Sequence, residues 1–330
     1  MRPLELAVTA GCPSGIGPEV TVRALAVVAP TLSDARFTVF GDAGAIADAS
    51  RLARVDLSSQ SNVRVVAVSE LAPHDRVPGS PSVAGGRAQL AAIDAALDAV
   101  LSGDLHGIVT APVSKRAITD AGVAFKGHTE HLAARAGVSR VVMHFAGPKL
   151  RVSLVTTHHA IANVPSKVTR EAVRETVLIT ARALSTDFGI ASPRVAVAGL
   201  NPHAGEGGLL GREEIDVITP AIEEARAELR GATVTGPVPA EAVFRHARDG
   251  RYDAVIAMYH DQATIASKLL DFGDAVNVTL GLPFVRTSVD HGTAYDIAGL
   301  NLADPHGMAV ALELGASLTR ARRASSAVDA

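Results

Sequence analysis

Residues 4–29 have the sequence LELAVTAGCPSGIGPEVTVRALAVVA, which predicts a strand, a glycine-rich turn and a helix in that order. The apolar run at 4–9 favours a strand, and residues 18–29 favour a helix because Pro and Glu suit a first helical turn. The turn at 11–19 offers backbone amides to an anion. It lacks the G-x-G-x-x-G pattern of dinucleotide sites, and a plain tight turn explains it equally well.

The same alternation of short apolar runs and longer Ala-rich segments continues along the chain, and predicts an α/β protein with largely parallel sheets. Further strands are expected at 37–40, 63–68, 106–110, 151–155, 194–198, 254–258 and 276–280. Further helices are expected at 86–101, 114–121, 169–184, 213–229 and 302–314, and a loop at 73–82. Residues 320–330 are small and polar, so we expect them to fray. The length of 330 residues favours two domains.

Composition argues against several classes of protein. Hydrophobic residues make up 48% and charged residues 20%, which is typical of a globular protein. The net charge of -3, the 3% aromatic content and the lack of Trp argue against nucleic-acid binding. Cys12 is the single cysteine, so no internal disulfide forms, and we interpret it as a small buried residue. No signal peptide or membrane span is evident, which favours a cytoplasmic protein without a membrane partner.

Three histidines follow the ends of three expected strands. They are His158, then His203 within NPHAGEGG, and His260 within YHDQ. Ligands of open α/β sheets bind at the carboxyl ends of the strands, and three imidazoles there would bind a divalent metal with open positions. Asp261 is either a ligand or a hydrogen-bond partner of one. Any one such histidine is more often a hydrogen-bonded loop residue, and spacing alone does not separate His158 from His159.

Two further polar segments have both a structural and a functional interpretation. In GHTEHL at 127–132, Thr129 either begins a helix or joins His128 as a donor to a phosphate or carboxylate. The segment DHGTAYDIAG at 290–299 combines small residues with two acids, which suits the ribose of an adenosine only weakly. We weigh the two interpretations of the first segment equally.

Basic residues occur near these polar loops. Lys115 follows an Ala-Pro-Val-Ser turn, Lys268 follows the His260 segment, and Arg286 follows a strand that contains Asn277. Lys and Arg beside a metal site suit a phosphorylated or carboxylated substrate. For any one of them, a solvated surface charge is the default interpretation.

Taken together, these segments resemble the 4-hydroxythreonine-4-phosphate dehydrogenases, the NAD-dependent family of vitamin B6 biosynthesis. The resemblance covers nearly the whole chain and rests on residues 15–19, 111–115, 127–130, 156–158, 199–208, 258–262, 277–284 and 286–294. It implies two α/β/α domains with mostly parallel sheets, like those of isocitrate and isopropylmalate dehydrogenases, with the active site in the interdomain cleft. The implied domains are 1–135 plus 286–330, and 136–285 with the metal ligands and dimer contacts.

The resemblance also implies roles for residues. The metal ligands would be His158 rather than His159, with His203 and His260, and one of the three comes from the partner subunit of an obligate homodimer. Substrate contacts would be His128, Thr129, Lys268, Asn277 and Arg286. The catalytic candidates are Lys115, Glu241 and Asp261. The cofactor-binding candidates are Asp290, His291, Gly292, Thr293 and Asp296.

The implied reaction oxidises the C3 hydroxyl of 4-phosphooxy-L-threonine with NAD or NADP, and the resulting β-keto acid loses carbon dioxide to give 3-amino-2-oxopropyl phosphate. A divalent ion would acidify that hydroxyl and polarise the new ketone. Zinc, magnesium, cobalt, nickel and manganese all remain open.

Several positions differ from the family pattern. Glu241 stands where the family usually has Asp. Residues 159–161 and 263–267 differ from the family pattern, and residues 268–277 are more acidic than it. These differences leave one alternative function open, which is that of a relative in the same family that oxidises 4-phospho-D-threonate or 4-phospho-D-erythronate. Less favoured are a dehydrogenase of a cis-dihydrodiol dicarboxylate and a non-catalytic ligand-binding homologue.

Overall fold

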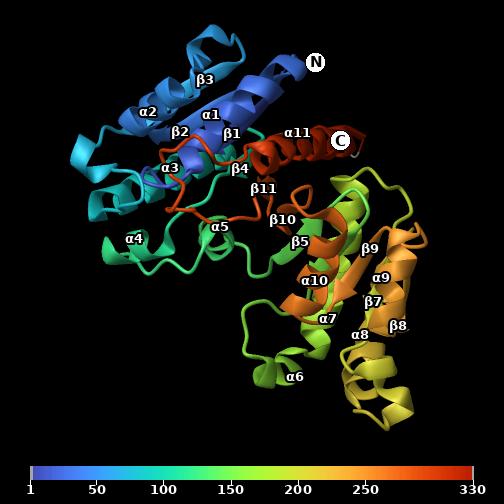
Figure 1. The fold of residues 1–330 in the computed structure, drawn as a ribbon. Helices are drawn as coiled ribbons and strands as arrows, with labels where there is room; N and C mark the ends of the chain where they lie inside the picture. Colours follow the sequence, from blue (N-terminus) through green and yellow to red (C-terminus); the bar gives the residue numbers. More distant parts are fainter. Residues whose placement is uncertain (1–2, 329–330) are drawn as a thin grey trace. The chain divides into compact units, whose positions relative to one another are not determined.

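The computed structural model describes residues 3–328 (Figure 1). The chain divides into two compact units, Met1–Gly137 with Leu282–Arg320, and Val138–Gly281 with Ala321–Ala330. This division differs from the expected one at the C-terminus, because residues after Arg320 group with the second unit. There Arg322 donates to the buried carboxylate of Asp187 at 2.7 Å.

Unit 1 contains a fully parallel run of strands in the order β3-β2-β1-β4-β11. These strands are β1 Leu4–Thr9, β2 Ala35–Asp42, β3 Val63–Ser69, β4 Gly107–Thr110 and β11 Val285–Ser288. The helices that begin in this unit are α1 Gly17–Val28, α2 Ala43–Ala53, α3 Val83–Leu101, α4 Lys115–Asp120, α5 His128–Arg135 and α11 His306–Val328.

Unit 2 has the strand order β10-β5-β6-β9-β7-β8, in which only the pairs of β5 are antiparallel. Its strands are β5 Val142–Ala146, β6 Arg151–Leu154, β7 Arg194–Ala198, β8 Thr233–Val238, β9 Ala254–Ala257 and β10 Val276–Leu280. Its helices are α6 Val164–Lys167, α7 Arg170–Thr186, α8 Thr219–Glu228, α9 Ala240–Arg248 and α10 His260–Asp271.

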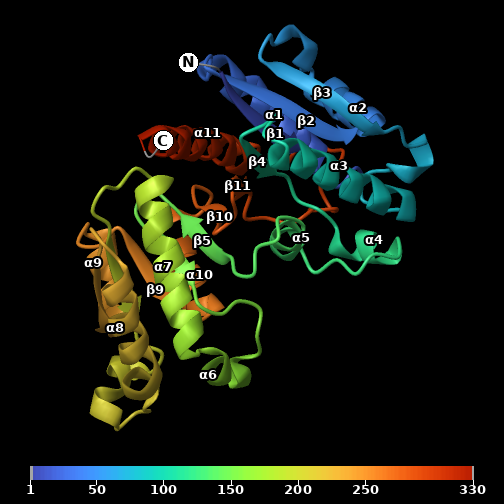
Figure 2. The same cartoon turned by 180° about the vertical axis from the view of Figure 1, so that it is seen from behind.

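Alternating side chains of the central strands are buried on both faces of the unit 2 sheet, as expected for parallel strands covered by helices. Val195 and Val197 of β7 pack with Ile256 of β9 under α7 and α8, on the face seen in Figure 2. Ala196 and Ala198 pack instead under α9 and α10, on the face seen in Figure 1. The central strands therefore hold their carboxyl-terminal turns on a rigid base.

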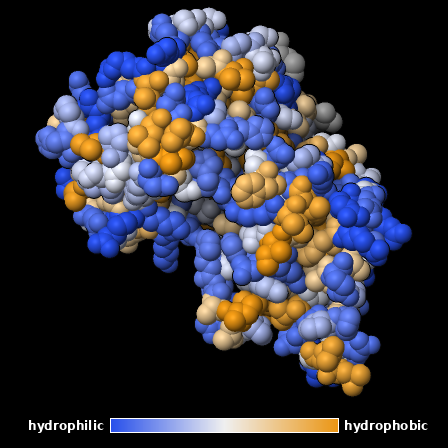
Figure 3. All heavy atoms as spheres, viewed as in Figure 1, coloured by the Kyte–Doolittle hydropathy of each residue, from blue (hydrophilic) through white to orange (hydrophobic). Residues whose placement is uncertain are grey.

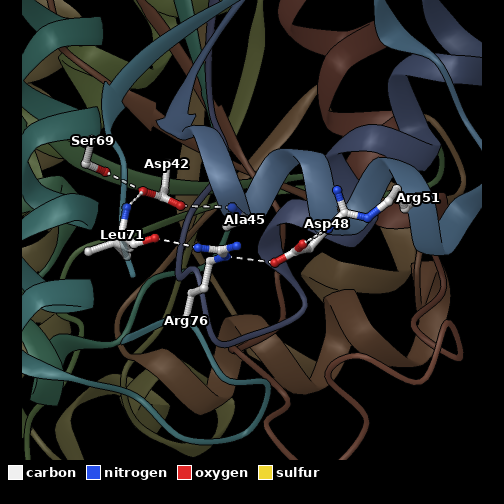
Figure 4. Close-up of polar contacts among 7 residues, drawn as sticks. All are labelled: Asp42, Ala45, Asp48, Arg51, Ser69, Leu71 and Arg76. Carbon is white, nitrogen blue, oxygen red and sulfur yellow. Dashed lines mark hydrogen bonds and ion pairs between the residues drawn. The ribbon is translucent and has the colours of Figure 1, made fainter. Parts of the chain in front are cut away.

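Side-chain caps fix several helix starts. Asp42 accepts from the amide of Ala45 at 2.8 Å, and its other oxygen accepts from the hydroxyl of Ser69 and the amide of Leu71 (Figure 4). Arg76 completes this network by donating to Asp48 at 2.7 Å. One buried carboxylate thus ties the start of α2 to the end of β3.

The expected strands are confirmed to within one or two residues at most ends, and the α/β fold with mostly parallel sheets is confirmed. The expected helix at 302–314 instead begins at His306 and continues to Val328, so the expectation of fraying from 320 is wrong over the described residues. Arg320 holds that end through Asp34 at 2.8 Å. The expected helix at 213–229 starts with a π-helical turn at Glu214–Ile218. Within residues 3–328, no helix has the length and hydropathy needed to cross a membrane.

Candidate active-site residues

The three candidate metal ligands follow three neighbouring parallel strands of unit 2. β9 pairs with β6 on one side and with β7 on the other. His158 follows β6, His260 is the first residue of α10 after β9, and His203 lies in the turn after β7. The parallel sheet therefore brings all three turns to one edge, which is where the spacing predicted them.

Two of the three imidazoles are in contact. The ring centroids of His158 and His260 lie 5.6 Å apart, with 44° between their planes. They line a small cavity of about 160 Å³ together with Thr157, Tyr259 and Asp261. A metal–nitrogen bond of ~2.1 Å places a ring centroid roughly 3.2 Å from the ion, so two tetrahedral ligands have centroids roughly 5 Å apart. The observed separation fits two ligands of one divalent ion.

Asp261 fixes the orientation of the His260 ring. Its carboxylate accepts a hydrogen bond from His260 Nδ1 at 2.7 Å. With the proton on Nδ1, the lone pair of Nε2 is available to a cation, and the carboxylate makes the ring a stronger ligand. The side chain of Asp261 is 73% exposed, so it also has room for a direct polar contact.

His203 lies in an unusual left-handed turn. Six consecutive residues, 203–208, have positive φ angles, and three of them are not glycine. A left-handed conformation costs roughly 1–2 kcal/mol for each non-glycine residue, so other contacts must hold this turn. His203 Nδ1 lies 3.4 Å from Oε1 of Glu241, and both side chains are exposed.

Residues 3–328 of one chain do not complete a set of three ligands. Across the described residues, no group of three or more His, Cys, Asp and Glu side chains is placed to hold a metal. The chain therefore brings His158 and His260 together and leaves His203 beside Glu241.

Hydrogen bonds from side chains connect the three histidine turns. The hydroxyl of Thr156 donates to the carbonyl of Met258 at 2.7 Å. Gln262 accepts from the amide of Met258 at 2.7 Å and donates to the carbonyl of Gly199 at 2.9 Å. Sequence reasoning assigned no role to Thr156 or Gln262, although both belong to the quoted motifs. The Thr156 contact spans 102 positions of sequence and the Gln262 contact spans 63, and local patterns do not reveal contacts of that range.

A second polar cluster lies in unit 1. Arg286 of β11 is 3% exposed and donates to the hydroxyl of Thr110 through Nε at 3.2 Å and Nη2 at 2.7 Å. Burial lowers the pKa of Arg286 to about 10, a shift that Glu130 opposes, so the guanidinium stays charged at neutral pH. A buried cation of this kind favours an anionic ligand.

His128 begins α5 beside this arginine. Burial, followed by the charges of Arg286, His131 and Lys115, holds the pKa of His128 well below its ordinary value, so its ring is neutral. Its Nε2 is buried and has no hydrogen-bond partner among the described residues. A side chain on Gly127 would come within 3.0 Å of Glu130 Oε2 and 3.5 Å of Lys115 Nζ, so both of these charged groups lie beside the glycine. Thr129 lies in the first turn of the same helix.

The remaining candidate substrate residues, Lys268 of α10 and Asn277 of β10, belong to unit 2. Asn277 Oδ1 is buried without a partner among residues 3–328. The acidic segment between these two residues has a structural explanation, because buried Asp271 accepts from the amides of Lys149 at 3.3 Å and Leu150 at 3.0 Å. That carboxylate holds the β5–β6 turn.

The candidate cofactor loop packs on the glycine-rich turn of unit 1. The carbonyl of Thr293 accepts from the amide of Ile16 at 3.0 Å, and a side chain on Gly15 would come within 2.9 Å of that carbonyl. Close packing thus explains this glycine without an anion. Burial raises the pKa of the Cys12 thiol, which lies 3.4 Å from the Tyr295 hydroxyl. This environment disfavours the thiolate and agrees with a packing role for the cysteine.

The other candidate cofactor residues lie along the same loop. His291 Nδ1 contacts the carbonyl of Gly292 at 3.1 Å, and Asp296 is exposed.

The fold is similar to that of isocitrate dehydrogenases. The isocitrate dehydrogenase of Methylococcus capsulatus aligns with a TM-score of 0.52 and 14% identity, over 99% of this chain and 88% of the other, which shows a shared fold alone. The chain also matches the sequence model described as "Pyridoxal phosphate biosynthetic protein PdxA" over residues 33–315. It belongs to that family, and it is an enzyme, a dehydrogenase.

Individual relatives agree with this assignment. The chain is 46% identical to a 4-hydroxythreonine-4-phosphate dehydrogenase of Burkholderia vietnamiensis, over 98% of both sequences. The crystal structure of the Klebsiella pneumoniae 4-hydroxythreonine-4-phosphate dehydrogenase aligns with a TM-score of 0.85 and 37% identity, over 96% of this chain and 99% of the other. A terephthalate 1,2-cis-dihydrodiol dehydrogenase from Burkholderia xenovorans aligns with a TM-score of 0.69 and 33% identity, over 96% and 98%.

Proposed function

We propose that this enzyme oxidises the C3 hydroxyl of 4-phosphooxy-L-threonine with NAD, or with NADP in its place, and that it requires a divalent metal. The β-keto acid then loses carbon dioxide and yields 3-amino-2-oxopropyl phosphate. The observation that carries the proposal is the contact between His158 and His260, at 5.6 Å between ring centroids, on the edge formed by three parallel strands. Membership of the family supports this choice of substrate.

The donor set fits a divalent metal, and His158, His203 and His260 would hold it. Zinc, cobalt, nickel or manganese suits imidazole ligands best, and magnesium remains open. When bound, the metal lowers the pKa of the substrate hydroxyl and polarises the ketone that forms. Asp261 and Glu241 act as positioning residues in this scheme, through their contacts with His260 and His203.

The unit 1 cluster supplies the binding of the phosphate. Arg286 is a charged, buried donor held by Thr110, and the side chain of Lys115 lies beside Gly127. The buried Nε2 of neutral His128 is the third polar group of the cluster. Thr129, Lys268 and Asn277 are proposed as further substrate contacts. Fixing the phosphate fixes the position of C3, which is how such contacts accelerate transfer of a hydride.

The electron balance of the reaction is simple. The C3–H bond breaks and its electron pair goes, as hydride, to the nicotinamide, while the hydroxyl proton leaves to a base. Lys115 is the proposed proton-transfer group because it belongs to the phosphate cluster. Residues 290–296, which pack on the glycine-rich turn, are the proposed contacts of the adenosine.

We propose a homodimer in which the two subunits complete each metal site. Single-chain geometry leaves His203 outside any three-ligand group among residues 3–328. Large apolar side chains are exposed on the segments that carry the candidate ligands, with Leu209 83% exposed after the His203 turn and Phe272 83% exposed after α10. Figure 3 shows apolar surface over the segment between β7 and α8 and over α10. Ile265 and Leu269 of α10 belong to the same exposed set, and apolar patches of this kind mark interfaces between proteins.

An activity panel tests the proposed function. Formation of NADH is followed with 4-phosphooxy-L-threonine and with 4-phospho-D-threonate, each with and without a chelator. We expect the first to be the better substrate and the chelator to abolish turnover. 4-Phospho-D-threonate is the alternative substrate, because Glu241 stands near His203 where the family usually has Asp. Turnover of neither compound, or turnover that survives complete removal of the metal, would overturn the proposal.

A further inference from the structure

The left-handed turn that carries His203 sits on one buried carboxylate. Glu214 is 3% exposed, and its Oε1 accepts hydrogen bonds from the amides of Leu200 and Asn201, each at 2.7 Å. Its Oε2 accepts from the side-chain amide of Asn201 at 2.9 Å. A carboxylate with three such donors is fully occupied, and its charge strengthens each bond.

The turn is also packed against this carboxylate. A side chain on Gly205 would come within 2.6 Å of Glu214 Oε2, and one on Gly199 within 3.2 Å of Oε1. Both ends of the segment that holds His203 therefore approach the carboxylate closely. The π-helical turn that starts at Glu214 belongs to the same arrangement, and such turns are frequent at functional sites.

Gln262 connects this turn to the His260 segment. Its amide nitrogen donates to the carbonyl of Gly199 and its oxygen accepts from the amide of Met258, two residues before His260. The two metal-ligand turns thus share one hydrogen-bonded framework, in which Glu214 holds the His203 end.

We propose that Glu214 is a positioning residue for metal binding, which holds the His203 turn in the left-handed conformation that presents its imidazole. This proposal rests on the metal site proposed above. It deepens that site by naming the buried group that keeps the third ligand in place. The carboxylate anchors Leu200 and Asn201, from which the turn starts, and so offsets part of the cost of its left-handed backbone.

The test compares Glu214→Gln and Glu214→Ala with Glu213→Gln in the purified full-length enzyme. Glu213 is a matched control, because its Oε2 also accepts from the side chain of Asn201, at 2.7 Å, whereas the backbone amides of Leu200 and Asn201 donate to Glu214. Zinc affinity is measured by competition with a chromophoric chelator, and the melting temperature is measured in metal-free protein.

We expect zinc affinity to fall roughly 10–100-fold in Glu214→Ala, less in Glu214→Gln, and little in Glu213→Gln. The glutamine variant keeps one oxygen for the two backbone amides, so partial rescue is part of the expectation. A lower melting temperature with unchanged zinc affinity would show a merely structural role and overturn the proposal. If wild-type enzyme binds none of zinc, cobalt, nickel, manganese and magnesium, the proposed function fails instead, so the two failures are distinguishable.

A second variant covers the case in which Glu214→Ala does not fold. Gly205→Ala introduces a methyl group against Glu214 Oε2 at a position with φ +81°, outside the strands and regular helices. We expect it to fold and to weaken zinc binding as Glu214→Ala does. Wild-type zinc affinity in both Gly205→Ala and Glu214→Gln would overturn the proposal.

Discussion

The carboxylate of Asp261 lies 2.7 Å from Nδ1 of His260, so the ring is oriented before any cation binds. Removing the negative charge weakens the imidazole as a ligand and releases the ring. We predict that Asp261→Asn lowers zinc affinity roughly 10–100-fold. Asp216→Asn is the control, because Asp216 pairs only with exposed Arg212 on the surface. Equal zinc affinities in the two variants would contradict this role.

In the phosphate cluster, we predict the effect of replacing Arg286 with lysine. Lysine in its place keeps the charge but loses the forked donation to Thr110. A hydrogen bond to a charged group contributes about 1.5–3 kcal/mol, so Arg286→Lys should lower kcat/KM about 10–100-fold. The loss should appear mainly in KM for the phosphorylated substrate, measured by steady-state kinetics. Arg116→Lys, on the exposed face of α4, should behave as wild type.

We predict that Asp271 contributes to the stability of the protein and does not contact the substrate. Its carboxylate is buried and accepts from the backbone amides of Lys149 and Leu150. Asp271→Ala should lower the free energy of unfolding by about 1–3 kcal/mol, because those amides lose their partner. Chemical denaturation measures this change, with exposed Asp249→Ala as the control. A changed KM in the still-folded Asp271 variant would show that the acidic segment contacts the substrate after all.

His144 makes the stability depend on pH. It is fully buried in β5, with Nδ1 2.8 Å from the Ser153 hydroxyl, and burial, aided by the charge of Arg151, lowers its pKa from 6.5 to about 3. The unfolded chain therefore takes up this proton more readily than the folded one. Stability from this group is present above pH 6.5 and is lost as the pH falls toward 3, by on the order of 4 kcal/mol.

The measurement compares the free energy of unfolding of wild type and His144→Gln between pH 7 and pH 4. Glutamine keeps a partner for Ser153 but does not titrate in this range. We expect a shallower decline with falling pH in the variant. Parallel curves for the two proteins would contradict the assignment. His128 adds a decline in the same direction, because burial lowers its pKa too.

Much of the fold could be predicted because it depends on local patterns. The run at 194–198 is apolar and buried on both faces of its sheet, and β7 has those same bounds. The polar turns after β6, β7 and β9 were evident for the same reason, and parallel pairing places them at one edge. The helix that starts at His260 was not predicted, because its Ala-Thr-Ile-Ala-Ser segment was interpreted as a change near the substrate site.

The supporting residues of the site could not be predicted, because their contacts are long-range. Glu214 lies outside the NPHAGEGG motif and reaches it only through the π-helical turn. Gln262 contacts Gly199 across 63 positions of sequence. Likewise, only the folded chain shows that Asp271 binds the β5–β6 turn. Residue type suggested each ligand, whereas the hydrogen-bond partners that orient the ligands depend on the packed sheet.

In the proposed site, His158, His203 and His260 bind one ion, and these ligands are divided between two subunits. The direct test co-expresses pairs of inactive chains, each with one of these histidines changed to Ala. A divided site has two ligands from one chain and one from the other, so two of the three pairings regenerate an intact site. Random assembly gives those pairings about a quarter of wild-type activity. The remaining pairing stays inactive. Restoration in none of the three pairings would contradict the account.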